Sequence, residues 1–373
     1  MTTSPLALRK HLRHLKDPRI NRCKRHLLLD IITMGICAVI GGANTWTDMA
    51  TFARCRKDWF QRFLELPNGI PSHHTFERVF DRLEPQALQQ CLVAWLHSIS
   101  ETIGFRHIAI DGKSLRHSGG GSSPLRCLHL VSAWATEANL TLGQVATEEK
   151  SNEITAIPRL LELLDLHGAL VTIDAMGCQK EIAKKIVEKG GDYALAVKGN
   201  QEHLEEDILA CFINAYDNDL QGIQYDKYET EEDGHGRHEK RVCEVICEPA
   251  GIRNQQEWEK LQIVGKIYRE RTENGKTSYE EQYFIGSKRC SAKRYGVALR
   301  NHWGIENKLH WQMDVTFGED ASRIQKRHGG QNFALLRRLA LGLLKQHPSK
   351  DSIRSKRYEA TLDVSFLEEI LKK

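Results

Sequence analysis

Apolar residues recur at helical spacing through the first hundred residues of the chain. The apolar run 27–43, the segment 46–64 and the stretches on either side of Pro85 each fit a helix with one apolar face. A loop at 66–71, rich in proline and glycine, separates the second helix from the third. This pattern predicts an all-helical domain over residues 1–100. Short helices around a tight turn suit either a helix-turn-helix DNA reader or a helical bundle, and the spacing favours neither.

The pattern changes near residue 105, where short apolar runs begin to alternate with helical segments. Strands are predicted at 107–110, 128–136, 141–147, 169–173 and 193–197, and helices at 154–166, 179–189 and 201–216. Three strands followed by alternating helices and strands is the order of an RNase H-like mixed sheet. Residues 101–220 are therefore predicted to form the first part of such a catalytic core.

The third part of the chain, residues 221–290, alternates polar and apolar positions between polar turns, which is typical of antiparallel strands. Helical spacing returns at 292–312 and 330–345, within the last segment, 291–373. The predicted fold class is therefore mixed α/β. It combines an all-helical N-terminal domain, an RNase H-like core and a β-strand insertion that precedes the last helices.

One apolar run, Leu27–Ala43, is the candidate for a membrane span. Asp30 interrupts the run, which is also shorter than the roughly 20 residues that a span requires. We therefore expect a buried helix and no membrane association. The ten cysteines contain no CxxC pair, and no secretory signal is evident, which indicates reduced thiols in a cytoplasmic protein.

The formal net charge of +4 says little about partners, but its distribution along the chain says more. Residues 1–40 carry eight Lys/Arg against two acids, and residues 321–360 carry ten against two. Residues 201–250 run the other way, with fourteen acids against four bases. Two basic regions that flank an acidic one suit a protein that grips a polyanion, although ordinary solvated helix faces explain the same charges.

Two acids occupy equivalent places, because each follows a short apolar strand: Asp111 after 108–110 and Asp174 after 170–173. In the predicted strand order the first and fourth strands are neighbours, so these carboxylates would lie side by side at the carboxyl edge of the sheet. Two adjacent carboxylates repel each other unless a divalent cation neutralises them. Oxygen ligands of this kind predict Mg²⁺, and two such ions about 4 Å apart can promote in-line phosphoryl transfer.

A third acid is expected from a later helix, and Glu306 is the strongest candidate. On an ideal helix His302, Glu306 and His310 share one face, so a metal carboxylate would stand between two phosphate-contacting imidazoles. A surface polar stripe or a zinc site explains the same spacing. Rival acids follow at Asp314, Glu319 and Asp320.

Three blocks of sequence around these acids resemble the bacterial insertion-sequence transposases of the H-repeat-associated type, named from Rhs elements, within the DDE superfamily. The blocks are 108–113, then 172–179 with 196–201, then 300–307 with 309–311 and 314–317. The turn 69–76 is similar to the helical domain that precedes the catalytic core in that family. The resemblance covers almost the whole chain.

The resemblance implies a DNA transposase that cuts and rejoins the ends of its element by two-metal phosphoryl transfer. Asp111, Asp174 and Glu306 would be its catalytic, metal-binding triad for two Mg²⁺ ions, with Mn²⁺ able to substitute. Related transposases carry an arginine one turn before the glutamate, whereas His302 stands there in this chain. A histidine is charged only near or below its pKa of about 6.5, so its role as a phosphate clamp is open.

The expected partner is double-stranded DNA, both the terminal repeats of the element and the target. Candidate DNA contacts, besides His302 and His310, are the basic residues Lys113, Lys198, Arg323, Lys326 and Arg327. Two ends must be brought together, so a homodimer on DNA is expected. Two rival functions stay open, a nuclease with the same core that never transposes and a non-catalytic DNA-binding relic of a mobile element.

Overall fold

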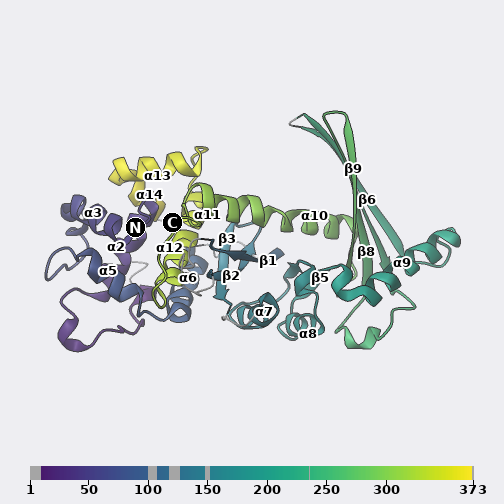
Figure 1. Ribbon diagram of the computed structural model, residues 1–373, viewed down its shortest axis with the longest axis horizontal. Coiled ribbons are helices and arrows are strands. Elements are labelled where there is room, and N and C mark those ends of the chain that lie inside the picture. Colours follow the sequence, from purple (N-terminus) through teal and green to yellow (C-terminus); the bar gives the residue numbers. More distant parts are fainter. Residues whose placement is uncertain (1–9, 100–106, 117–126, 148–151, 235, 372–373) are drawn as a thin grey trace.

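A computed structural model describes residues 10–99, 107–116, 127–147, 152–234 and 236–371. The molecule is elongated, with helices at one end, a sheet in the middle and a long β-arm at the other end (Figure 1). The helices are α2 (Leu28–Ile40), α3 (Trp46–Cys55), α4 (Lys57–Phe60), α5 (His73–Phe80), α6 (Pro85–Ile99), α7 (Glu153–Glu162), α8 (Lys180–Glu188), α9 (Glu202–Asp217), α10 (Ala292–His302), α11 (Trp311–Val315), α12 (Gly329–Gln346), α13 (Ile353–Leu362) and α14 (Val364–Leu371). The strands are β1 (His107–Ser114), β2 (His129–Ala135), β3 (Leu140–Ala146), β4 (Leu170–Ile173), β5 (Asp192–Val197), β6 (Tyr225–Gly234), β7 (Arg237–Cys247), β8 (Ile263–Glu273) and β9 (Lys276–Gly286).

Helix α2 is the buried helix that the sequence predicts. Every residue from Asp30 to Ile40 is buried, because α3, α5, α12 and α13 pack around the helix. The carboxylate of Asp30 accepts a hydrogen bond from the backbone N–H of Leu66 at 3.0 Å, so the charge in the apolar run has a partner inside the protein. Among the described residues, no helix combines the length and apolarity needed to cross a bilayer.

Helix α12 joins the C-terminal part of the chain to the N-terminal helices. It packs against α2, α5, α6 and β3, and it shares one hydrophobic core with them. Four bases of the segment 321–360 are buried in this region: Arg337, Arg338, Lys356 and Arg357. The strong positive charge of that segment is therefore only partly a surface property, and it overstates the surface that could meet a polyanion.

The core sheet has the strand order predicted from the sequence. Strands β1, β2 and β3 form an antiparallel meander, while β4 pairs in parallel with both β1 and β5. Helices α7 and α8 lie below this sheet in Figure 1, and α10 lies above it. The mixed sheet with crossover helices confirms the predicted fold class.

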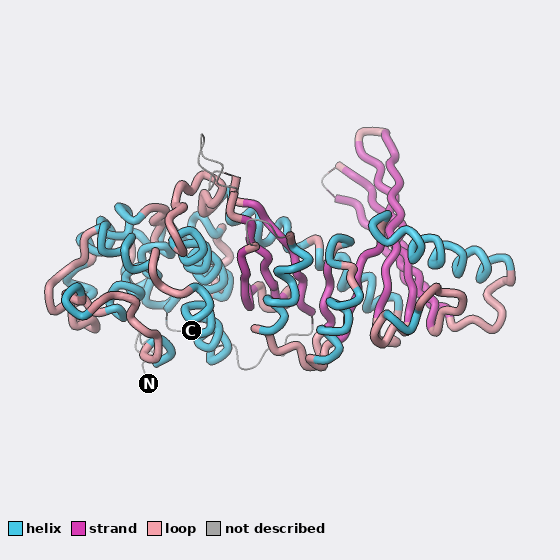
Figure 2. The backbone as a smooth tube through the Cα atoms, turned by 60° about the horizontal axis from the view of Figure 1, so that its bottom comes forward, coloured by secondary structure: helices cyan, strands magenta, loops and turns pink. Residues whose placement is uncertain are grey.

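The β insertion extends this sheet and does not form a separate layer. Strand β9 pairs antiparallel with β5, so the nine strands run in the order β3-β2-β1-β4-β5-β9-β8-β7-β6. The outer halves of β6 to β9 project beyond the helices as the arm (Figures 1 and 2). The alternating pattern of 221–290 therefore predicts the strands correctly, and long-range pairing with β5 decides where they lie.

Candidate active site

Asp111 and Asp174 lie side by side, as the strand order predicts. Strand β1 pairs in parallel with β4 as far as Ile110 and Ile173, and an aspartate follows each of these residues. Asp174 comes directly after β4, whereas Asp111 lies within β1, which continues to Ser114 beyond the predicted end of the strand. Both strands are almost wholly buried up to that point, so the sheet presents the two carboxylates at the edge of the core. This edge is where the carboxyl ends of parallel strands carry the chemistry of α/β folds.

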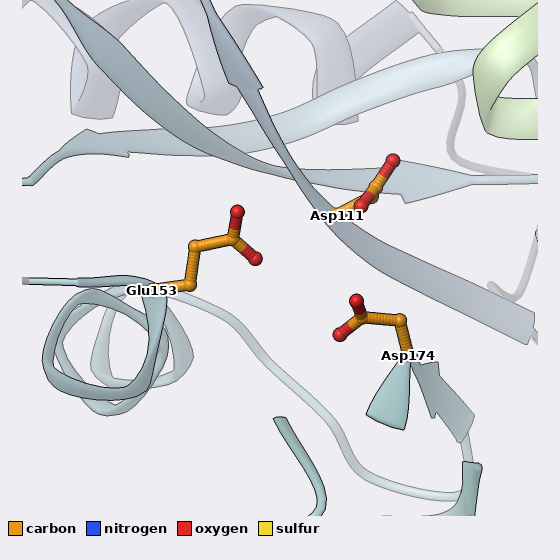
Figure 3. A group of neighbouring side chains, drawn as sticks. All are labelled: Asp111, Glu153 and Asp174. Carbon is orange, nitrogen blue, oxygen red and sulfur yellow. The ribbon is translucent and has the colours of Figure 1, made fainter. Parts of the chain in front are cut away.

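A third carboxylate joins them, and it belongs to Glu153 at the start of α7. One ligand oxygen from each of Asp111, Glu153 and Asp174 can be chosen so that all three lie within 4.8 Å of one another. Figure 3 shows the side chains of Glu153 and Asp174 turned toward each other, with the Asp111 carboxylate beside them. Glu153 is absent from the sequence prediction, because an acid in the first turn of a helix is ordinarily explained by the helix dipole. In the sequence, the position of Glu153 shortly after the third predicted strand is the signal that could have indicated a place near the site.

The surroundings set the two aspartates apart electrostatically. Burial alone would raise the pKa of Asp111, but a hydrogen bond with His310 and that imidazole's charge lower it below its usual value. Burial raises the pKa of Asp174, and the negative charge of Glu153 raises it further. Among the described residues, none of the three carboxylates forms an ion pair with lysine or arginine. Their mutual repulsion is therefore left to be balanced by histidines or by a bound cation.

The helix that carries Glu306 packs across the same edge of the sheet. The ring of His302 lies 3.0 Å from the hydroxyl of Thr172, and Nε2 of His310 lies 3.1 Å from Oδ2 of Asp111. Glu306 itself is exposed and is not part of the carboxylate group. A π-helical turn, Glu306–His310, begins at this residue and alters the helical register between the two histidines. The sequence predicts that His302, Glu306 and His310 share one face of an ideal α-helix. This segment is not an ideal α-helix, because it contains the π-helical turn.

The two histidines face the protein in this structure. Burial lowers the pKa of His302 below 6.5, so the ring is neutral at pH 7 and has little attraction for a phosphate. His310 is buried against Asp111. Both rings therefore make contacts within the protein, and their contacts with DNA phosphates stay a prediction.

Lys113 and the rival acids for the third ligand bind one another. The Lys113 ammonium pairs with Asp314 and lies 3.5 Å from Glu319 and 3.7 Å from Asp320. Glu319 is fully buried and also pairs with Arg338 at 2.6 Å. These carboxylates are neutralised by cations of the chain, so the structure favours none of them as a metal ligand. A Lys113 contact with DNA would require the ammonium to leave three acids.

The remaining basic candidates are exposed. Lys198 follows β5 at the same edge of the sheet as Asp174. Arg323, Lys326 and Arg327 lie in the loop between α11 and α12, where Lys326 is 3.5 Å from Glu77. These side chains are accessible to a nucleic acid backbone.

Comparison with known proteins agrees with the family indicated by the sequence motifs. Residues 103–343 match the family described as "Transposase DDE domain", and residues 9–96 match its associated region, "DDE_Tnp_1-associated". The chain belongs to the DDE transposase family. The predicted resemblance is thereby confirmed, and a family of this kind generally depends on divalent metal ions and binds DNA.

Individual relatives are similar over nearly their whole length. The chain is 37% identical to the "H repeat-associated putative transposase YhhI" of Escherichia coli K12 over 370 residues, 98% of this chain and 97% of the relative. It is 38% identical to the "Putative transposase YncI" of Escherichia coli O157:H7, over 93% of this chain and 90% of the relative. A solved structure, the piggyBac transposase synaptic complex with hairpin DNA, aligns with a TM-score of 0.38 at 10% identity, over 98% of this chain and 77% of that one.

Proposed function

We propose that this chain is an active DNA transposase that cuts and rejoins the ends of an insertion sequence. Water would hydrolyse a phosphodiester at the end of the element, and the freed 3′ hydroxyl would then displace a phosphodiester oxygen of the target DNA. The observation that carries the proposal is the placement of Asp111 and Asp174 directly after Ile110 and Ile173, the last paired residues of two parallel strands, inside the region that matches the transposase domain. Phosphoryl transfer needs positioning and charge neutralisation more than covalent help from the protein.

Mg²⁺ fits the donor set, and Mn²⁺ is expected to substitute for it. Asp111, Glu153 and Asp174 each offer a carboxylate oxygen, which is the kind of ligand that hard divalent cations prefer. These ligand atoms lie within 4.8 Å of one another. Two such ions bound here would activate the attacking oxygen and stabilise the leaving oxygen of an in-line displacement. The chain's own part is to hold Asp111 through His310 and to keep Asp174 in its N-terminal capping contact with Gly177, where the carboxylate accepts from the backbone N–H at 3.3 Å.

Glu306 is proposed as the third carboxylate of the triad. It is supported by its place on the segment whose two histidines contact Thr172 and Asp111, at one turn from each. Its exposure leaves the side chain free to face a ligand or DNA at this edge. A π-helical turn at such a position is typical of functional sites.

Double-stranded DNA is the proposed substrate, as terminal repeats and as target, on chromosomal DNA in the cytoplasm. Lys198, Arg323, Lys326 and Arg327 are proposed contacts with its backbone, because their side chains are exposed and positively charged. The helices of residues 1–100 are proposed to read the ends of the element. A homodimer assembled on DNA would bring two ends together.

Cleavage of a labelled duplex that carries the flanking terminal repeats tests this function. Wild type is compared with Asp111→Asn, Asp174→Asn and Glu306→Gln at fixed salt and with Mg²⁺, because DNA affinity depends steeply on salt. Each substitution should slow nicking at the repeat boundary by on the order of a thousandfold, which corresponds to several kcal/mol of transition-state stabilisation. Glu162→Gln, an exposed glutamate of α7, is the matched control and should cleave normally.

The alternatives give different results in the same assay. Binding without cleavage by wild type contradicts the proposal and supports the relic. Cleavage that ignores the repeat boundary supports a nuclease. Cleavage that survives Glu306→Gln removes this residue from the triad while leaving the two aspartates in place.

A further inference from the structure

The first turn of α7 brings Glu153 to the two aspartates from the opposite side of the sheet to α10. Helix α7 is anchored on β2 and β3 by Ile157, Leu160 and Leu161, which are all buried. Figure 1 places α7 below the sheet and α10 above it. The Glu153 side chain is 13% exposed, so its carboxylate lies in the interior of the site and not on the outer surface of the helix.

Gly112 provides the room for this approach. A Cβ atom at position 112 would lie 2.1 Å from Oε1 of Glu153 and 2.6 Å from Nε2 of His129. Any other residue at position 112 would therefore push the Glu153 carboxylate away from Asp111, which precedes Gly112 in the chain. The backbone N–H of Gly112 donates to Oδ1 of Asp111 at 2.9 Å, so the same residue fixes one aspartate and admits the glutamate.

His129 and Ser114 hold the glutamate in this position. Nε2 of His129 lies 2.8 Å from Oε1 of Glu153, and Nδ1 lies 2.7 Å from the hydroxyl of Ser114. These two residues face each other across β1 and β2. With the proton on Nε2, the ring donates to the carboxylate and accepts from the serine, which is the arrangement that orients metal-binding carboxylates from behind.

We propose that Glu153 is a ligand of the divalent-ion site formed by Asp111 and Asp174, and that His129 positions its carboxylate. The inference rests on the proposed function, because it adds a ligand to the same site. Three carboxylates within 4.8 Å, without a lysine or arginine partner among the described residues, carry more negative charge than the two paired histidines can balance. Glu153 binds from the α7 side of the sheet and leaves the α10 side to Glu306.

Binding of Mn²⁺ to the full-length protein, measured by electron paramagnetic resonance without DNA, tests the inference separately from activity. Glu153→Gln keeps the shape of the side chain and an oxygen for His129, but it removes the charge. We expect its Mn²⁺ affinity to fall by about 10- to 100-fold. Glu162 lies at the other end of the same helix and binds Lys185. The Mn²⁺ affinity of Glu162→Gln should therefore equal that of wild type.

The variants Asp111→Asn and Asp174→Asn distinguish failure of the Glu153 inference from failure of the proposed metal site. If these variants lose Mn²⁺ binding while Glu153→Gln retains the affinity of wild type, Glu153 is not a ligand and the proposed two-aspartate site stands. If neither aspartate variant affects Mn²⁺ binding, the proposed site itself is wrong.

A second measurement uses the wild-type chain and so does not depend on how a variant folds. Fe²⁺ bound in place of Mg²⁺, with ascorbate and peroxide, generates hydroxyl radicals that cut the backbone next to the ion. Cuts near residue 153 as well as near residues 111 and 174 are expected. Cuts near the two aspartates alone would overturn the role of Glu153.

Discussion

The carboxylate site and the β-arm are both rich in acids, yet they treat these acids in opposite ways. In the arm, which comprises the projecting halves of β6 to β9, Glu229 pairs with Lys240 at 2.6 Å and Glu239 with Arg241 at 2.5 Å. Arg269 faces Glu280 directly across β8 and β9 and pairs with it. At the sheet edge, Asp111, Glu153 and Asp174 meet without any such cation among the described residues.

The difference shows which acids carry information about function. Residues 201–250 hold fourteen acids, but cross-strand pairs with lysine or arginine neutralise several of them, including Glu229, Glu232 and Glu244. Among the described residues the site holds three acids, and folding brings them together from separate segments of the chain. Acids that the fold brings together without a lysine or arginine partner indicate a cation site, whereas a high count of acids along the sequence does not.

The largest effect on stability is expected at a third kind of acid, buried and paired. Glu319 and Arg338 have side chains that are 0% and 1% exposed and form an ion pair at 2.6 Å. Glu319→Gln leaves the Arg338 charge buried with a weaker partner, so the free energy of unfolding should fall by about 3–5 kcal/mol. Urea unfolding measures this loss, and Mn²⁺ affinity of the folded variant should stay that of wild type. A loss in Mn²⁺ affinity as large as that of Asp111→Asn would contradict the division between structural and site acids.

A smaller effect is expected from pH, because a neutral histidine lies behind the site. His107 is buried between the hydroxyls of Thr136 and Thr172, at 2.8 Å from each, and burial, together with the charge that His302 acquires when it is protonated, lowers the pKa of His107 to about 3. The unfolded chain binds a proton here below pH 6.5, while the folded chain does not until about pH 3. Stability from this group is therefore complete above pH 6.5 and is lost as the pH falls, by roughly 2 kcal/mol at pH 5.

Unfolding in urea at pH 7 and pH 5 measures this pH dependence. His107→Asn is less stable at pH 7, since it loses packing, but its stability should depend less on pH than that of wild type. An equal loss between pH 7 and pH 5 in both proteins would assign the effect to other groups.

Gly112→Ala sharpens the comparison at the site itself. The added Cβ meets the end of the Glu153 side chain and Nε2 of His129, so both side chains must shift, but the three nearest atoms belong to side chains and none to the backbone. We expect Mn²⁺ affinity to fall by about tenfold, equivalent to about 1.4 kcal/mol, with a nearly unchanged melting temperature. Gly199→Ala is the control, because nothing lies within 4 Å of the added atom there. A large loss of melting temperature in Gly112→Ala alone would show that the glycine serves the fold and not the site.

The smallest effect is expected in the arm. Glu232→Gln removes the partner of Arg300, but both side chains are largely exposed, so water and salt already weaken the pair. The melting temperature, the Mn²⁺ affinity and cleavage should all stay within measurement error of wild type. A clear loss of cleavage with unchanged Mn²⁺ affinity would instead make the arm part of the DNA-binding surface.

The sequence by itself determined the core strands, the buried helix α2 and the adjacency of Asp111 and Asp174. These features depend on local patterns, because apolar runs predict buried strands and the order of strands and helices limits how they can pair. The family motifs around the acids were equally visible along the chain, and family comparison confirms the transposase fold and class.

Only the tertiary structure decided which other residues reach the site. Glu153 joins the aspartates because α7 packs on β2 and β3 and because Gly112 leaves space, and neither condition is visible as a local pattern. Lys113 forms an ion pair with Asp314, about two hundred residues later in the chain. A lysine that the sequence predicts to contact DNA is therefore paired with an acid of the same chain. Side chains meet through the twist of the sheet and the packing of helices, and these depend on contacts between segments far apart in the sequence.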